Sequence, residues 1–83
     1  MLFDRRKREI KEAIKQQEEE IAHFEEILEM RRREWASLAS SLHGEFPTRD
    51  QAEALSDLRD RIEAREKDLA NKYQELQRLR ESL

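Results

Sequence analysis

Apolar residues in the first half of the chain recur every seven positions, on two tracks that alternate by four and three residues. This is the spacing of the a and d positions of a coiled-coil helix, whose apolar seam faces a partner helix. The pattern predicts one long helix over about residues 3–43. The d track contains Phe3, Ile10, Phe24 and Leu38, and the a track contains Ile14, Ile21, Leu28, Trp35 and Leu42.

A second seam follows in the last third of the chain and predicts a helix over about residues 49–82. Between the seams, Gly44 suits the left-handed conformation that ends many helices, and Pro47 cannot continue a helix. We therefore expect a turn at residues 44–48. Thr48 and Gln51 have the spacing of a capping box. The second seam has Leu55, Ile62, Leu69, Leu76 and Leu83 at a, and Leu58 and Leu79 at d.

A turn this short forces the two helices to run antiparallel. The predicted fold is therefore all-α: a single domain over residues 1–83, an antiparallel two-helix coiled-coil hairpin that can dimerise into a four-helix bundle. The a positions face d positions throughout when the numbers of facing residues sum to 93. This register places Trp35 against Leu58 and Ile14 against Leu79. The alternative, one continuous parallel coiled coil, conflicts with the interruption of the heptads at the turn.

Polar residues interrupt both seams. The register places each interior one opposite an apolar residue, so that no two charges share a layer. We interpret them as residues that fix the register while their stems lie along the seam, or that meet the carboxylates of a partner. The facing pairs are Gln17 with Leu76, Arg31 with Ile62, Arg65 with Leu28, and Lys72 with Ile21.

Beside the seam, the same register predicts three ion pairs between the helices and one repulsion. Exposed ion pairs stabilise a protein only slightly, so they support the register without deciding it. The predicted pairs are Glu34 with Arg61, Arg32 with Glu66, and Glu18 with Arg80, whereas Glu20 faces Glu75.

The composition agrees with long, solvated helices, since 45% of the 83 residues are charged and only one is Gly and one Pro. A chain this small buries too little surface to be comfortably stable alone, so we expect it to associate. Its 20 acidic and 17 basic residues nearly cancel, so no overall field attracts nucleic acid. It has no Cys, no secretory signal and no stretch of ~20 apolar residues, which predicts a soluble cytoplasmic protein.

The N-terminal residues form the strongest local charge feature. The basic cluster lies at a helix N-terminus, where the helix dipole disfavours cations. Met1, Leu2 and Phe3 lie beyond the residues that face the second helix. We interpret this end as a site that docks on an acidic protein groove or on an anionic membrane surface, or as a frayed, solubilising end. The cluster consists of Arg5, Arg6, Lys7 and Arg8.

Several apolar residues lie beside the two seams or are candidate anchors for a partner. Ile27 and Met30 lie next to Phe24 off the first seam, and Tyr73 lies off the second, which indicates a shallow second apolar stripe. Trp35 is an interface anchor, because Trp is frequent in binding hot spots, or it fills the core opposite Leu58.

The predicted turn carries an acidic tip around Glu45, Phe46 and Asp50. His43-Gly44-Glu45 at the tip of an antiparallel hairpin resembles the N-terminal hairpin of the Gre-type transcript-cleavage factors. That resemblance implies insertion of the tip into the secondary channel of RNA polymerase to hold a metal ion. It covers only these three residues and the architecture, and Thr48 stands where the second acidic residue of that family is expected.

Other candidate chemistry is weak. Residues 31–33 are three arginines, but their side chains point in different directions and no aromatic residues repeat beside them, so nucleic-acid binding is not expected. Glu20 and His23 have the spacing of di-iron ligands but do not project into the core. His43 fits a helix-end cation better than a catalytic base. We expect no catalytic residues, no metal, no cofactor and no small-molecule substrate.

The leading hypothesis is a non-enzymatic coiled-coil interaction protein, such as an adaptor, a small chaperone or an assembly subunit, that binds a helical protein or itself. One alternative is a regulator of a large enzyme such as RNA polymerase, acting through the acidic tip. Another is a peripheral membrane-associated coiled coil that uses the basic N-terminus.

Overall fold

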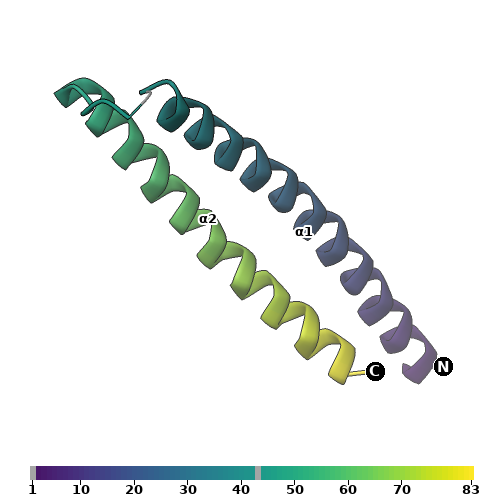
Figure 1. The fold of residues 1–83 in the computed structure, drawn as a ribbon. Helices are drawn as coiled ribbons and strands as arrows, with labels where there is room; N and C mark the ends of the chain where they lie inside the picture. Colours follow the sequence, from purple (N-terminus) through teal and green to yellow (C-terminus); the bar gives the residue numbers. More distant parts are fainter. Residues whose placement is uncertain (1, 43) are drawn as a thin grey trace.

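The computed structural model describes the backbone of residues 2–42 and 44–83, and the side chains of residues 4–42 and 44–83. This part of the chain forms two helices, α1 (Leu2–Ser40) and α2 (Arg49–Glu81), which pack against each other antiparallel (Figure 1). They make a rod of 66 × 15 × 15 Å. The predicted all-α hairpin is confirmed.

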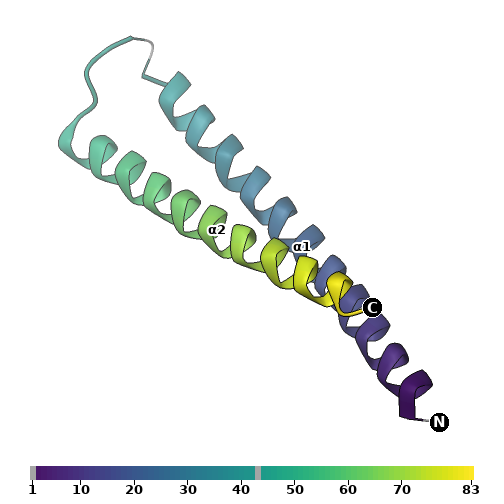
Figure 2. The same cartoon turned by 90° about the horizontal axis from the view of Figure 1, so that it is seen from below.

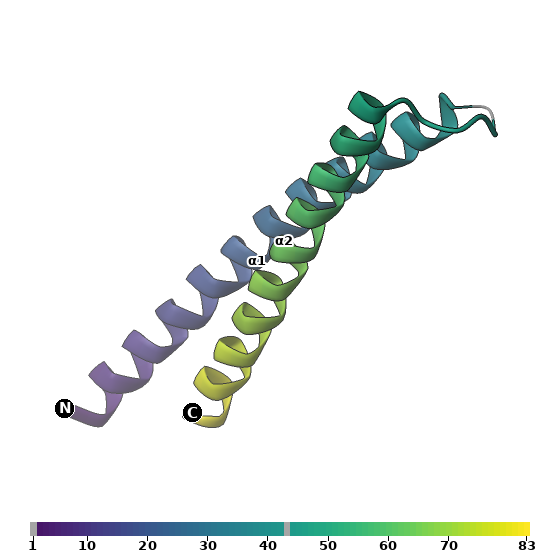
Figure 3. The ribbon, with the colours of Figure 1, turned by 90° about the vertical axis from the view of Figure 1, so that its left-hand side faces the viewer.

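The two helices wind around one another instead of lying strictly parallel. They overlap near the termini in Figure 2 and near the turn in Figure 3, so the direction from one helix to the other rotates along the rod. Figure 2 also shows that the N-terminal end of α1 extends past the end of α2. A seam with a seven-residue repeat causes this winding, because 3.6 residues per turn do not divide seven evenly.

Helix α1 ends three residues earlier than the heptad pattern predicts. The pattern continues to about residue 43, but the last helical residue is Ser40, and position 43 lies outside the described residues. The Ser41 hydroxyl donates a 2.6 Å hydrogen bond to the Leu38 carbonyl. Serine side chains that bond locally to the backbone compete with helical hydrogen bonding, which favours an early end. Gly44 then takes the expected left-handed conformation, with φ of 78°.

The start of α2 is fixed by the predicted capping box. The Thr48 hydroxyl accepts a hydrogen bond from the Gln51 amide at 3.2 Å, and the Gln51 side chain accepts one from the Thr48 amide at 2.9 Å. These two bonds satisfy backbone donors that have no partner within the helix. Asp50 in the first turn adds a favourable interaction with the helix dipole.

The core is a thin strip in the middle of the rod. Leu28 packs with Leu58 and Ile62, and Leu69 packs against this cluster. Nearer the turn the seam is open, since Trp35 is 39% exposed and Leu38 is 44% exposed. Trp35 therefore fills the core only in part. The buried apolar residues of the described chain are Ile21, Leu28, Leu58, Ile62 and Leu76.

Substitution of Thr48 by Ala should lower the free energy of unfolding by about 1 kcal/mol, because the amide at the third helical position loses its acceptor. Urea denaturation followed by circular dichroism measures this change. Thr48→Ser keeps the hydroxyl and should retain most of the stability. Equal losses in both variants would contradict the role of the capping hydroxyl.

Candidate interaction surface

One side of the hairpin is closed by a row of polar contacts between the helices. Arg80 pairs with Glu18 at 3.4 Å, and Arg32 pairs with Glu66 at 3.4 Å, so both of these predicted ion pairs are confirmed. Midway between them, the Tyr73 hydroxyl donates a hydrogen bond to the Glu25 carboxylate. The α1 residues of this row are seven positions apart and share one heptad position. We call this the ladder side; its residues are Glu18, Glu25, Arg32, Glu66, Tyr73 and Arg80.

The opposite side, which we call the groove side, has a different character. Its residues occupy the other heptad position beside the seam, and small residues face each other near both ends of the row. On α1 and the first turn residue after it, the groove side contains Ala13, Glu20, Ile27, Glu34 and Ser41. On α2 and the residue after it, it contains Ala54, Arg61, Asp68, Glu75 and Ser82.

Two polar residues of the seam bond across the helices to acidic residues of the groove side. Gln17 Nε2 donates to Glu75 Oε2 at 2.8 Å, and Lys72 Nζ donates to Glu20 Oε2 at 2.8 Å. Lys72 is the most shielded charged partner, with only 22% of its side chain exposed. The predicted repulsion between Glu20 and Glu75 is therefore offset, because each carboxylate has its own donor.

The two arginines of the seam make the same kind of contact within their own helices. Arg31 pairs with Glu34 at 3.3 Å, and Arg65 approaches Asp68 at 4.0 Å. The predicted pair of Glu34 with Arg61 is replaced by the contact with Arg31. Three of the four acidic residues of the groove side thus pair with a cation of the hairpin itself, and the fourth, Glu75, accepts a hydrogen bond from the neutral Gln17 amide.

Phe24 helps to accommodate two of the cations in the seam. The Lys72 ammonium lies 5.0 Å from the centre of the Phe24 ring, and the Arg65 guanidinium lies 5.5 Å from it. Both distances are within the range of cation–π attraction. The stems of these side chains cover apolar surface while their charged ends reach the acids of the groove side.

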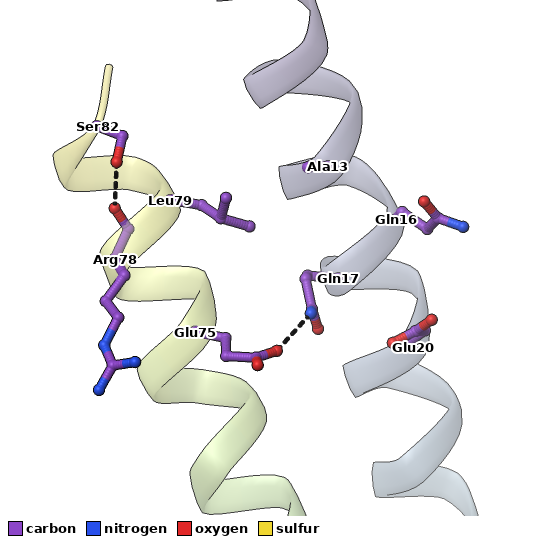
Figure 4. A pocket seen from close by; sticks show the side chains of 8 residues that line it. All are labelled: Ala13, Gln16, Gln17, Glu20, Glu75, Arg78, Leu79 and Ser82. Atoms are coloured by element: carbon purple, nitrogen blue, oxygen red, sulfur yellow. Dashed lines mark hydrogen bonds between the residues drawn. The ribbon is translucent and has the colours of Figure 1, made fainter.

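A groove of about 490 Å³ opens on the groove side near the chain ends (Figure 4). Ala13 and Ser82 are too small to close the seam here. The Gln17 and Glu75 side chains point toward each other between the helices, and Gln17 Oε1 is buried without a hydrogen-bond partner. The groove is lined by Ala13, Gln16, Gln17, Glu20, Glu75, Arg78, Leu79 and Ser82.

A smaller groove of about 230 Å³ lies on the same side near the turn, where Ser41 faces Ala54. Leu38 lines this groove and also a shallow hollow on α1 beside Met30. Met30 is 61% exposed and Leu38 is 44% exposed. The groove side therefore combines hollows with exposed apolar side chains.

The structure brings together only some of the predicted site residues. Ile27 and Met30 lie on or beside the groove side, but Tyr73 belongs to the ladder side, so the three do not form one stripe. The structure adds Leu38 to the exposed apolar residues of the groove side, although the sequence assigns this residue to the seam. Its exposure depends on how the helices pack near the turn, which no heptad pattern contains.

The two ends of the rod carry the remaining predicted residues and lie far apart. At the turn, Phe46 is 99% exposed, and Glu45 and Asp50 are exposed beside it. At the other end, Arg6 and Arg8 are exposed, and Arg5 pairs with Glu9 at 3.6 Å. Met1 lies outside the described residues, as do the side chains of Leu2 and Phe3, so their predicted partner contacts concern atoms that the structure does not describe.

The described side chains offer no group of three or more His, Asp or Glu residues placed to hold a metal ion. Over the same part of the chain, neither helix has the length and apolar character needed to cross a membrane. Comparison of the chain with family models, curated proteins and solved structures finds no significant match.

Tyr73 provides a test of the ladder side, because it is the only tyrosine in the sequence. Its hydrogen bond to Glu25, and to a lesser degree partial burial and the charge of Glu25, raise the Tyr73 pKa above 10.0. Titration of phenolate absorbance should give a midpoint above 10.0 that falls toward 10.0 in Glu25→Ala. Glu26→Ala should leave the midpoint unchanged.

The same shift predicts a pH dependence of stability. Because the folded protein holds this proton more tightly than the unfolded chain, the contribution is fully present below pH 10.0 and is lost as the pH rises through the folded pKa. A midpoint at or below 10.0 in the wild-type protein would contradict the Tyr73–Glu25 contact.

Proposed function

We propose that this protein is a non-enzymatic interaction module, a helical hairpin that binds another α-helical protein or a second copy of itself as an adaptor, small chaperone or assembly subunit. The observation that carries the proposal is the groove side, where Met30 and Leu38 are exposed beside two hollows. Apolar side chains around a hollow are the usual features of a surface that receives side chains of a partner helix. A cytoplasmic location fits a chain without cysteine.

The thin core supports the same proposal. Five buried apolar residues stabilise the described hairpin, and a fully buried Leu or Ile side chain contributes roughly 1.5–3 kcal/mol from transfer out of water. The ordering of two long helices opposes this gain with a conformational entropy cost of similar size. Burial of the groove side against a partner would add apolar area without ordering further backbone.

The electrostatics of the groove side also suit a protein partner. Its carboxylates already bond to Gln17, Arg31, Arg65 and Lys72. A surface on which most acidic residues are paired internally costs less to desolvate than one with unpaired charges. The partner therefore needs mainly apolar side chains of the right shape, as an amphipathic helix provides.

Affinity capture from the native cell tests the proposal when it compares two matched variants. Leu38→Glu places a charge on the groove side and should abolish capture of specific partners or copies. Ala36→Glu places the same charge two residues away on an exposed position of α1 outside both sides, and should capture the wild-type set. Identical sets from both variants, with helicity unchanged, would show that the groove side is not the interaction surface.

A further inference from the structure

We infer that the groove side is a self-association surface on which a second copy packs antiparallel, with the turn of one hairpin beside the open end of the other, to give a four-helix bundle. This inference rests on the interaction function proposed above and specifies the partner, the surface and the orientation. Three properties of the groove side lead to it: the symmetric spacing of its small residues, the fit of an exposed leucine to a groove, and the distribution of charge.

The spacing of the small residues is symmetric about the middle of the rod. Ala13 and Ser41 are 28 positions apart on α1, and Ile27 lies midway between them. Ala54 and Ser82 are likewise 28 positions apart. A two-fold axis that passes by Ile27 therefore places Ala13 and Ser82 of one copy over Ser41 and Ala54 of its partner. Closed two-fold dimers are the commonest oligomers and require such a self-complementary surface.

The same axis places an exposed side chain over an unfilled groove. Around Ile27, facing residues of the two α1 helices have numbers that sum to 54, so Leu38 of one copy lies level with Gln16 and Gln17 of the other. These glutamines line the groove of about 490 Å³ together with Ala13 and Glu20. Leu38 is 44% exposed in the single hairpin and becomes a knob in the hole of its partner.

Apolar side chains also meet at the axis itself. The sum of 54 places Ile27 against its own copy. Met30 lies beside Ile27 on the same surface and is 61% exposed in the single hairpin. Packing at the axis therefore buries a side chain that the hairpin alone leaves in water.

The charge at the two ends of the rod favours the antiparallel orientation of the copies. Residues 2–15 contain six basic and three acidic residues, whereas residues 34–57 contain five acidic and one basic. The antiparallel arrangement places the acidic turn of one copy beside Arg6 and Arg8 of the other. A dimer with turn over turn would bring the two acidic ends together and the two basic ends together, which is unfavourable.

Sedimentation equilibrium across the micromolar range should show a dimer of the wild-type chain. Leu38→Glu should raise the dissociation constant by roughly tenfold or more, because the knob at the groove becomes a charge. Ala36→Glu should leave it unchanged. A wild-type chain that is monomeric at all concentrations would overturn the inference, and the capture experiment would then decide the interaction function by itself.

Cysteine coupling tests the surface and the orientation without the Leu38→Glu variant, and so remains informative if that variant loses helicity. The chain contains no native cysteine, so each disulfide reports only on the introduced positions. Ile27→Cys should oxidise to a disulfide-linked dimer. An equimolar mixture of Ala13→Cys and Ser41→Cys chains should couple to each other faster than a mixture of Ala13→Cys and Ser82→Cys.

The reverse preference would mean that the turns lie together, and would overturn the orientation. A wild-type dimer in which neither Ile27→Cys nor the Ala13→Cys and Ser41→Cys mixture couples would overturn the surface. A dimer that does not couple at these positions would still be a self-associating protein. Failure of the proposed surface can therefore be distinguished from failure of the proposed interaction function.

Discussion

The structure depends on the way in which polar residues of the seam find acceptors beside it. Lys72 and Gln17 each lie opposite an apolar residue, and each bonds across the helices to a carboxylate of the groove side. Displacement of α2 by one heptad in either direction would place Lys72 beside Ile27 or Ala13 instead of Glu20, and would leave Asp68 and Glu75 of its own helix as its acidic neighbours. The apolar layers still pair a with d positions after such a shift, whereas the contacts across the helices are lost, so these contacts help to fix the register.

This constraint makes the two sides of the hairpin unequal. On the ladder side, polar and charged side chains span the seam and shield it. On the groove side, the cations come from within the seam, and the residues that would otherwise span it near the ends are Ala and Ser. The result is a neutral, hollowed surface with exposed apolar side chains, which is the kind of surface that a helical partner covers.

The sequence predicts much of this arrangement because coiled-coil geometry follows from a simple repeat. The antiparallel hairpin, the capping box of Thr48 and Gln51, and the pairs of Arg32 with Glu66 and Glu18 with Arg80 all follow from heptad positions and one register. These features depend on the backbone path and on residue spacing, which the repeat determines.

Features that depend on side-chain choice could not be predicted in the same way. Glu20 and Glu75 were expected to repel, but each has a donor within reach, and the rotamers of Lys72 and Gln17 decide the outcome. The exposure of Leu38 depends on packing near the turn. The early end of α1 reflects a local hydrogen bond of Ser41 that competes with the helix.

Disulfide formation within one chain tests the register most directly, since a disulfide requires Cα atoms within about 7 Å. The pair Ile14→Cys and Leu79→Cys faces across the seam in the register described and should oxidise rapidly to an intramolecular disulfide. Two pairs shifted by one heptad, Ile21→Cys with Leu79→Cys and Ile10→Cys with Leu76→Cys, should oxidise slowly. Faster closure of either shifted pair would contradict the account, because the contacts of Lys72 and Gln17 could not then hold the helices in place.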